Sequence, residues 1–478
     1  MNGMDENPLD LLPEVLLAAS AVLGLLLGAW LPRARQWMVG ALAGVACAVG
    51  IATATTASTG TAFDDAFAID PVTTTSRIVI LGATLLVLAL STGPLRSNAR
   101  ESEFYVLVQL AALGALMLAG AQDLLLLAAA YLLASVPSYV LAGFRKDAAG
   151  TEAALKYYVV GALLGVVMLG GITVLYAAGR ASAYPVLRGA LPEAPAGLVA
   201  VGLVALLAGL LFKAGGVPGH FWVPDAVQGS SAPVAAFLTT VPKIGALAAA
   251  YRLAAGPLSD TDVPWPALIA VLSAASMTLG NLAAFFQTDV KRLLAYSTIS
   301  QVGYLLMPVV VAGRADLAQQ ALLFYLAAYA LTNLGAFAVV CALPEARTIE
   351  DYRGLGRRRP ALAASLIVCL LGLVGTPPTA VFLGKLEAFS AAFDGGYAWL
   401  AVLAAVNTVA SLFYYLRWIA PAVTGRRSSG PIAAVPTAML LAYGAAAGSV
   451  VLGLMAGPVL GLLDGSLPPE PVELSSAN

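Results

Sequence analysis

Residues 210–226 read LLFKAGGVPGHFWVPDA, and the interruption of this apolar stretch indicates the class of fold. It begins as an apolar helix that carries Lys213, and two glycines and a proline then interrupt it before His220. Proline removes a helix hydrogen bond, and glycine lowers the cost of unwinding. In a membrane, unwound backbone is tolerated only where protein buries it or where it lines a polar cavity. The stretch therefore predicts a broken membrane helix with a buried ammonium group at the break.

Composition places the whole chain in a membrane. Of its 478 residues, 60% are hydrophobic and only 11% are charged, whereas soluble domains are about 45–50% apolar and about 25% charged. Many segments reach the roughly 20 apolar residues that a helix needs to cross a bilayer. The first of them, 11–31, follows Asp5 and Glu6 and no basic residues, so we expect a retained span and not a cleaved signal peptide. The sequence predicts one all-α, polytopic membrane domain over 1–478.

Apolar runs between polar breaks predict about fourteen membrane spans. The expected limits are 11–31, 37–56, 76–94, 103–121, 123–143, 153–178, 197–226, 232–255, 265–287, 292–312, 316–343, 361–393, 397–420 and 434–457. We interpret 103–255 and 265–420 as two inverted repeats of five helices each. The segments 11–94 and 434–457 are then flanking helices.

The basic residues are sorted between alternate loops. Fifteen of them fall in one set of loops, namely Arg33, Arg35, Arg96, Arg100, Arg145, Lys146, Lys291, Arg292, Arg347, Arg353, Arg357, Arg358, Arg359, Arg426 and Arg427. The other set holds five, namely Arg77, Arg180, Arg188, Arg252 and Arg314. Cytoplasmic loops carry the excess of lysine and arginine in membrane proteins. The sorting predicts that both termini lie outside the cytoplasm.

A second span repeats the interruption of the first. The twelfth predicted span breaks at Gly375-Thr376-Pro377-Pro378, as the seventh does at Gly215-Gly216-Val217-Pro218. Lys213 precedes its proline by five residues, whereas Lys385 follows Pro378 by seven. Paired broken helices in corresponding positions are the best sequence indication of a transport pathway in inverted-repeat transporters. The two breaks therefore predict where a solute or an ion crosses.

Only six of the 25 basic side chains are lysines, and three of these fall near the middle of their spans: Lys213, Lys243 and Lys385. A guanidinium stays protonated under protein conditions, whereas a desolvated ammonium can lose its proton. Where the charge is buried, we therefore expect lysine in this chain and not arginine. The alternative is that such a lysine is a static partner for a carboxylate or for helix C-terminal carbonyls.

The energies suit a proton relay. Burial can lower a lysine pKa by about 3–5 units, and at about 1.4 kcal/mol per unit this is roughly 4–7 kcal/mol. Moving one charge through about 150 mV costs about 3.5 kcal/mol, which is similar. Three buried lysines in a row are thus predicted to pass protons along the membrane plane. His220 either passes protons between Lys213 and Lys243 or is a hydrogen-bonded structural residue.

Other kinds of site are excluded by residue counts. Cys47, Cys341 and Cys369 lie far apart without a CxxC motif, which supports neither an iron–sulfur cluster nor a structural zinc site. His220 is the only histidine, so two histidines of this chain cannot hold a haem. No run of basic residues resembles a nucleic-acid-binding patch. Any redox chemistry connected with this chain must occur elsewhere.

Several motifs resemble those of a known family. They include QDLLLLAAAYLLASVPSYVLAGF (122–144), LLFKAGGVPGHFWVPDA (210–226), FFQTDVKRLLAYSTISQVGYLL (285–306) and GTPPTAVFLGKLEAFSAAF (375–393). In this order, over about residues 100–425, the chain resembles the antiporter-like membrane subunits of respiratory complex I, and among them the N-type subunits. The resemblance implies proton translocation in a bacterial cell membrane. It also implies membrane lipid and complex I membrane subunits of the M, K and J types as partners.

The resemblance gives Lys213, Lys243 and Lys385 the places of the family's lysines in the seventh, eighth and twelfth helices. A lysine at 385, where M-type relatives usually have glutamate, favours the N type. NADH, FMN, iron–sulfur clusters and quinone are then expected in partner subunits, with no cofactor in this chain. The enzyme activity would be that of an NADH-quinone oxidoreductase as a whole.

Two positions depart from the family pattern. Leu132 stands where the family usually has a fifth-helix glutamate, and Gln301 stands where relatives often have histidine. The missing carboxylate favours an alternative function, a structural module that keeps the fold without conducting protons. Another alternative is a subunit of an Mrp-type cation/proton antiporter or of a membrane-bound hydrogenase. It is also open whether sodium replaces the proton.

Overall fold

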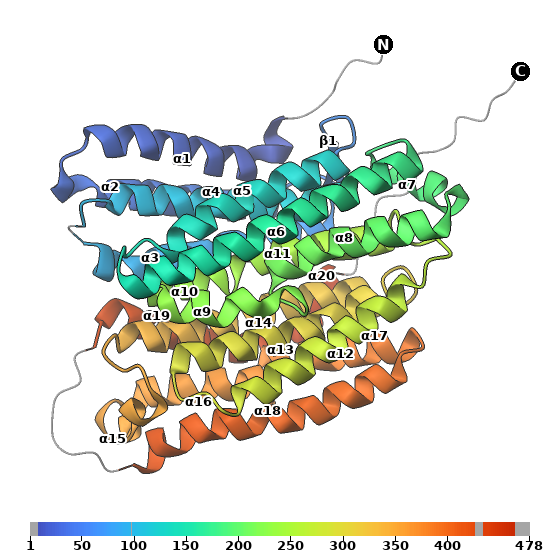
Figure 1. Ribbon diagram of the computed structural model, residues 1–478. Helices are drawn as coiled ribbons and strands as arrows, with labels where there is room; N and C mark the ends of the chain where they lie inside the picture. Colours follow the sequence, from blue (N-terminus) through green and yellow to red (C-terminus); the bar gives the residue numbers. More distant parts are fainter. Residues whose placement is uncertain (1–7, 97, 426–433, 464–478) are drawn as a thin grey trace, which may run out of the picture.

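The computed structural model describes residues 8–96, 98–425 and 434–463, and within them the chain forms a bundle of long helices that run side by side (Figure 1). The helices of the first half are α1 (Leu12–Trp30), α2 (Trp37–Ala54), α3 (Pro71–Leu95), α4 (Glu101–Gly120), α5 (Leu124–Ala142), α6 (Ala148–Gly179), α7 (Tyr184–Ala190), α8 (Ala196–Ala214), α9 (Trp222–Gly229), α10 (Ala232–Leu238) and α11 (Val241–Ala255). The helices of the second half are α12 (Trp265–Ala284), α13 (Val290–Val310), α14 (Leu317–Ala342), α15 (Leu355–Arg358), α16 (Pro360–Val374), α17 (Ala380–Asp394), α18 (Ala398–Thr424), α19 (Pro436–Leu454) and α20 (Ala456–Leu463).

Short elements connect these helices. The 3-10 helices are η1 (Pro8–Leu11), η2 (Arg33–Arg35), η3 (Leu191–Glu193), η4 (Gly219–Phe221) and η5 (Ile349–Tyr352). Strands β1 (Gly60–Ala62) and β2 (Phe67–Ile69) pair antiparallel, with Thr61 opposite Ala68. This hairpin between α2 and α3 is a small addition to the all-α fold predicted from the sequence.

The predicted all-α membrane fold is confirmed. Thirteen segments of the described chain are long and apolar enough to cross a membrane. The pair α16 and α17 adds a fourteenth crossing, because its two 15-residue halves are each too short to span a bilayer alone. The seventh and eighth crossings are likewise composite: α8 and α9 form one, and α10 and α11 form the other.

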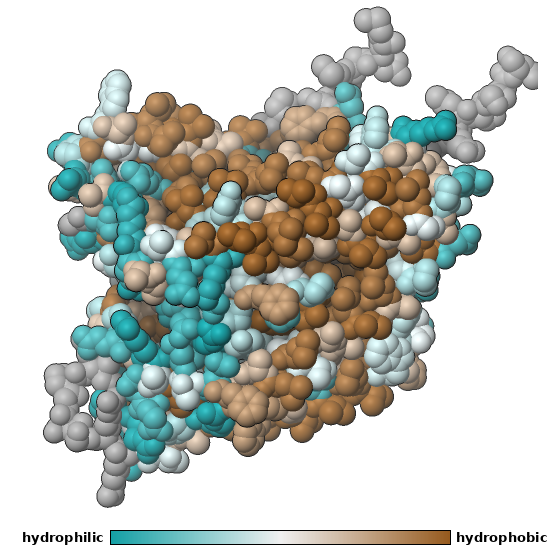
Figure 2. Space-filling model, in the orientation of Figure 1, coloured by the Kyte–Doolittle hydropathy of each residue, from teal (hydrophilic) through white to brown (hydrophobic). Residues whose placement is uncertain are grey.

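The centre of the bundle consists of α10, α11, α13 and α14. The most apolar part of the α10–α11 crossing is 100% buried in the protein, and the values for α13 and α14 are 94% and 89%. The corresponding value is only 33% for α1, α2, α6 and α18. Hydrophobic residues cover the middle of the visible surface, and hydrophilic residues gather at the end of the bundle where α15 lies (Figures 1 and 2). Charged groups on the central helices are therefore shielded from lipid.

Two buried arginines contradict the expectation that buried cations in this chain are lysines. Arg77 of α3 donates two hydrogen bonds of 2.8 Å to Glu14 of α1. Arg252, near the end of α11, donates hydrogen bonds of 2.7 Å and 2.5 Å to the carboxylate of Asp70. Both guanidiniums can be buried because each pairs with a carboxylate. Glu14 lies on α1, and Asp70 lies immediately before α3. A fixed ion pair requires no proton release, so arginine serves as well as lysine there.

Candidate functional site

The first break separates α8 from α9 at the place predicted. Gly215 ends α8 with a φ of +77°, a conformation that side chains other than glycine rarely adopt. The amides of Gly215 and Gly216 each donate to the Leu211 carbonyl at 2.8 Å, which closes the last turn. The chain then turns through Val217, whose amide donates to Ser276 Oγ at 2.9 Å, and resumes a helical path at η4. Unwound backbone in the middle of this crossing is thus held by protein groups, as the membrane setting requires.

Substituting Gly215 by alanine is expected to destabilise the protein by about 1–2 kcal/mol through the positive φ alone. A Cβ there would also lie 2.8 Å from Val223 Cγ2 and 2.9 Å from Lys243 Nζ, so the cost is at the upper end. Gly197→Ala on α8 is the matched control, because a Cβ there meets open space. Thermal unfolding in detergent should show a lower melting temperature for Gly215→Ala only. Equal melting temperatures would contradict a strained break.

The second break separates α16 from α17. Gly375, with a φ of +92°, ends α16, and α17 restarts at Ala380. Lys385 lies one turn into α17, and its ammonium donates to the carbonyls of Val374 at 2.8 Å and Leu373 at 3.3 Å. It also lies 4.0 Å from the centre of the Tyr304 ring. The last carbonyls of α16 have no hydrogen-bond donor within the helix. Lys385 of the following half-helix donates hydrogen bonds to them.

A third break was missed in the sequence, where 232–255 was predicted as one uninterrupted helix. The chain leaves helical geometry at Thr239 and Thr240, between α10 and α11. Pro242 in the first turn of α11 is the local signal, since proline favours the first turn of a helix. Lys243 follows at once, and its ammonium donates to the Ala214 carbonyl, the last of α8, at 2.6 Å. Each of the three predicted lysines therefore lies beside a helix break.

Lys213 differs from the other two lysines. It is completely buried, and its ammonium has no hydrogen-bond partner among the described residues. Two aromatic faces of α5 lie beside its ammonium, with ring centres 5.5 Å away for Tyr131 and 6.0 Å away for Tyr139. Leu132 is 47% exposed and so lies on the outer surface of α5. Lys213 and Lys243 are connected through the backbone, because Lys243 bonds the carbonyl of the residue that follows Lys213.

Gln301 of α13 joins the site at Lys385. Its side-chain amide donates to the Leu373 carbonyl at 2.8 Å, the same oxygen that Lys385 reaches, and it accepts a hydrogen bond of 2.7 Å from Tyr325. Gln301 and Tyr325 are both buried, on the central helices α13 and α14. The position where relatives often have histidine therefore contacts the lysine site directly. An amide there can orient the carbonyl but has no titrating proton.

A cluster of hydroxyl groups that was not predicted from the sequence surrounds the third break. Asn333 of α14 donates to Thr239 Oγ1 at 3.0 Å and to Thr240 Oγ1 at 2.9 Å. Tyr329, one turn earlier on α14, donates to the Thr239 carbonyl at 2.7 Å and also bonds Thr298 of α13. Tyr329 thus satisfies a backbone carbonyl that the break leaves without a helical partner, and Asn333 fixes the two threonine side chains. The pair of threonines before Pro242 was the available signal in the sequence.

His220 and Asp225 lie on the other side of the first break. No hydrogen bond or ion pair joins the half-buried His220 ring to a lysine among the described residues, and its Nδ1 has no partner there. Asp225 accepts hydrogen bonds from Lys156 at 2.9 Å and from Arg292 at 2.6 Å, and so fastens α9 to α6 and α13. The structure brings the three lysines to the helix breaks and leaves His220 outside their contacts.

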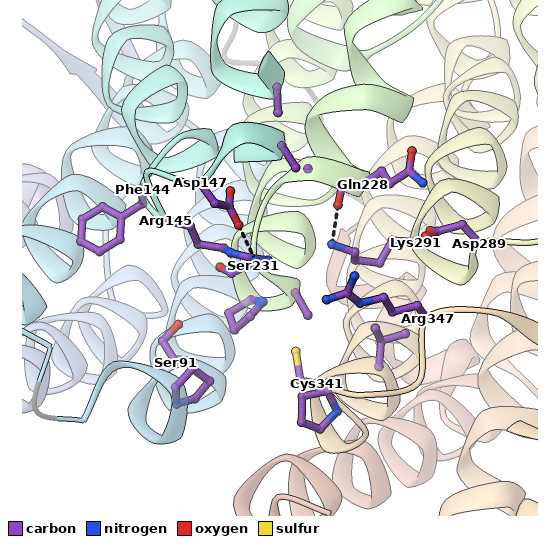
Figure 3. Close-up of a pocket in the computed structure, with 18 of the residues that line it drawn as sticks. Ser91, Phe144, Arg145, Asp147, Gln228, Ser231, Asp289, Lys291, Cys341 and Arg347 are labelled. Atoms are coloured by element: carbon purple, nitrogen blue, oxygen red, sulfur yellow. Dashed lines mark hydrogen bonds and ion pairs between the residues drawn. The ribbon is translucent and has the colours of Figure 1, made fainter. Parts of the chain in front are cut away.

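A cavity of about 820 Å³ opens at the end of the bundle where the arginine-rich loops lie (Figure 3). Arg145 borders it from the loop after α5, and Arg347 from the loop after α14. Lys291 of α13 donates to the carbonyls of Gln228 at 2.6 Å and Ser230 at 2.7 Å in its wall. Pro233 of α10 also lines it, so the cavity leads to the helix that ends at the third break. In the described chain, no group of three or more His, Cys, Asp or Glu side chains is arranged to hold a metal.

Comparison with known proteins identifies the family. A family model described as NADH:quinone oxidoreductase/Mrp antiporter, TM, matches residues 121–411. The NADH-quinone oxidoreductase subunit N 1 of Streptomyces griseus is 54% identical over 469 residues, which cover 97% of this chain and 99% of that protein. The subunit N of Mycobacterium sp. (strain JLS) is 51% identical over 461 residues and covers 95% and 97%.

The chain belongs to the NADH-quinone oxidoreductase subunit N family.

Solved structures agree with membership of the subunit N family. A chain of respiratory complex I from Thermus thermophilus with bound aureothin is 35% identical, with a TM-score of 0.82, over 95% of this chain and 100% of that one. A chain of the Mrp complex from Dietzia sp. superposes with a TM-score of 0.83 over 96% and 97%, but at 21% identity this likeness shows the fold alone. The Mrp alternative therefore has less support than the subunit N family, whose members sit alongside other membrane subunits.

Proposed function

We propose that this chain moves protons across the bacterial cell membrane as the N-type subunit of an NADH-quinone oxidoreductase. One observation carries the proposal: three buried lysines, Lys213, Lys243 and Lys385, each lie beside a break in a membrane helix. A buried cation without a carboxylate partner is costly in a protein interior, and such residues in membranes mark ion pathways. None of the three makes an ion pair with a carboxylate of the described chain.

The proposed relay runs from Lys213 through Lys243 to Lys385. The contact of Lys243 with the Ala214 carbonyl connects the first two positions. Gln301, which bonds the Leu373 carbonyl together with Lys385, lies on the α13 side of the last position. Each ammonium releases its proton when a neighbouring charge or a conformational change makes the cation too costly, and regains it afterwards. His220 is an accessory proton carrier in this proposal, by way of water, since no direct contact joins it to a lysine.

The 820 Å³ cavity is the proposed proton entrance, and its end of the bundle is proposed to face the cytoplasm. The arginine-rich loops support this orientation, because cytoplasmic loops carry the excess of basic residues. With fourteen crossings, both termini then lie outside. Electron transfer from NADH through FMN and iron–sulfur clusters to quinone is proposed to occur in partner subunits.

Lys213→Ala in the complete assembly, reconstituted in vesicles, is expected to lower the number of protons pumped per NADH oxidised by the share that this chain carries. Lys146→Ala is the control, because Lys146 is exposed and does not line the cavity. The measurement is a pH-sensitive dye inside the vesicles, with NADH oxidation followed in parallel. A proton yield equal to the wild type would contradict the relay.

A structural role without conduction is the second candidate, and the exposed Leu132 in place of the family glutamate favours it. In that case, the alanine variants of Lys213, Lys243 and Lys385 all assemble and pump as the wild type does. A sodium-linked mechanism predicts instead that pumping depends on external sodium and that the lysine variants abolish sodium movement. The same vesicles with and without sodium separate these outcomes.

A further inference from the structure

The ammonium of Lys213 forms no ion pair with a carboxylate of the described residues. Its side chain is 0% exposed, so a residue of a neighbouring subunit cannot touch it without a rearrangement of this chain. No described carboxylate forms an ion pair with it, and no described acceptor is within hydrogen-bond distance. Lys243 and Lys385 each have backbone carbonyls to bond, so Lys213 alone requires another source of stabilisation.

Two tyrosines of α5 supply that source. Tyr131 and Tyr139 are eight residues apart and so occupy one face of the helix, and the ammonium lies within 6.0 Å of both ring centres. Aromatic rings attract a cation within about 6 Å of the ring centroid, and most strongly where water is excluded. The hydroxyl of Tyr131 has no partner among the described residues, so the face of this ring and not its oxygen is engaged.

The surrounding helices hold the two rings in place. Gly161 and Gly165 lie one turn apart on α6, and a Cβ at Gly161 would overlap the Tyr139 hydroxyl, whereas one at Gly165 would lie 3.3 Å from Tyr131 Cε1. Tyr157 of α6 packs edge-on against Tyr139, with ring centres 4.7 Å apart, and stacks on Trp222 at 3.9 Å. The rings at Tyr131 and Tyr139 thus occupy a space that α6 leaves open for them.

We propose that the ring faces of Tyr131 and Tyr139 hold the protonated form of Lys213 and take the role of a carboxylate counter-ion. They are positioning residues, since they act through the lysine and carry no proton themselves. The inference rests on the proposed function of Lys213 in proton transport. An aromatic face is a weaker partner than a carboxylate and carries no net charge. The lysine can therefore give up its proton without leaving an unpaired negative charge behind.

The test changes the electron density of the ring and leaves its shape nearly constant. Position 131 is filled with phenylalanine and then with mono-, di- and trifluorinated phenylalanine in the full-length chain, within the complete assembly. Proton pumping per NADH is measured in vesicles. The quantity compared is the share of pumping that Lys213→Ala removes. Tyr131→Phe is expected to keep this share within about twofold of the wild type, and each fluorine to lower it further, to about a tenfold loss of the share for the trifluorinated ring. The same series at position 139 is expected to show a smaller decline, because that ring is more distant.

Tyr176 on α6 is the matched control, because it is 50% exposed and faces no cation in the described chain. The series at Tyr176 should be flat. A flat series at both 131 and 139, with pumping lowered in Lys213→Ala, overturns the ring-face partner and leaves the proposed function standing. A Tyr131→Phe variant as impaired as the trifluorinated one also overturns it, because the hydroxyl would then be the essential group. If Lys213→Ala pumps normally, the proposed function itself fails.

Discussion

Lys243→Gln is expected to assemble normally and to lose coupled turnover by about a hundredfold, the lower range for a positioned proton-transfer group. Glutamine fits within the volume of lysine and can still donate a hydrogen bond to the Ala214 carbonyl, which Lys243 bonds at 2.6 Å. It cannot bind or release a proton at neutral pH. The substitution therefore keeps the capping role at the end of α8 and removes the proton-carrying role.

Lys243→Arg extends the same test, because a guanidinium keeps the charge but never releases its proton. We expect it to be as inactive as the glutamine variant. Lys146 provides the control, since it lies exposed in a loop and does not line the cavity. Lys146→Gln should retain most of the coupled turnover. If Lys243→Gln pumps like the wild type, Lys243 only caps α8, and the relay would lose its central member.

The sequence predicted those parts of the site that local chemistry determines. Gly215 and Gly375 end the first halves of their spans, because only glycine adopts their positive φ without cost. A proline follows each of them closely. Lys213, Lys243 and Lys385 could be identified because an ammonium within a long apolar segment is costly and is therefore rare where it has no function. Both signals are contained within a few residues, so no knowledge of the tertiary packing was needed.

The remaining features depend on which helices meet. Arg252 was assigned to a loop, yet it is buried because Asp70, 182 residues earlier in the chain, lies beside it. In the sequence, Leu132 marks the position where the counter-ion of Lys213 is missing. Only the structure shows that Tyr131 and Tyr139 face Lys213 and that Leu132 faces outward. Contacts between distant helices leave no periodic signal in one sequence, and an aromatic residue that cages a cation looks like any core residue.

Asp70→Asn is expected to destabilise the folded chain by about 3–5 kcal/mol, because it leaves a buried guanidinium without its counter-charge. Arg252 bonds both carboxylate oxygens of Asp70, at 2.7 Å and 2.5 Å, and also the Ala119 carbonyl at 2.5 Å. The ion pair thereby fastens the end of α11 to the start of α3 and the end of α4. The loss of stability is measured by heating the detergent-purified assembly and comparing the temperature at which this subunit is released from the variant and from the wild type.

The pair also gives a pH dependence of defined sign. Burial acts to raise the pKa of Asp70, but the charge and hydrogen bonds of Arg252, together with the backbone amide of Thr73, lower the pKa below its ordinary value overall. A lowered pKa in the folded state means that the stabilisation is complete above the unfolded value of about 3.9 and is lost as the pH falls through the folded value. Asp70→Asn should therefore be less stable than the wild type at neutral pH, and the gap should close only in strong acid.

Asp260→Asn separates the effect of burial from that of charge pairing. Asp260 pairs with Arg188 at 2.9 Å, but both side chains are largely exposed, so the loss should be at most about 1 kcal/mol. Replacing Asp70 and Arg252 together by apolar residues should recover much of the stability, because no buried charge is then left unpaired. If Asp70→Asn costs no more than Asp260→Asn, the buried pair does not hold α3, α4 and α11 together. The helices around Lys243 would then depend on apolar packing and on the hydrogen bonds that Asn333 and Tyr329 make at the third break.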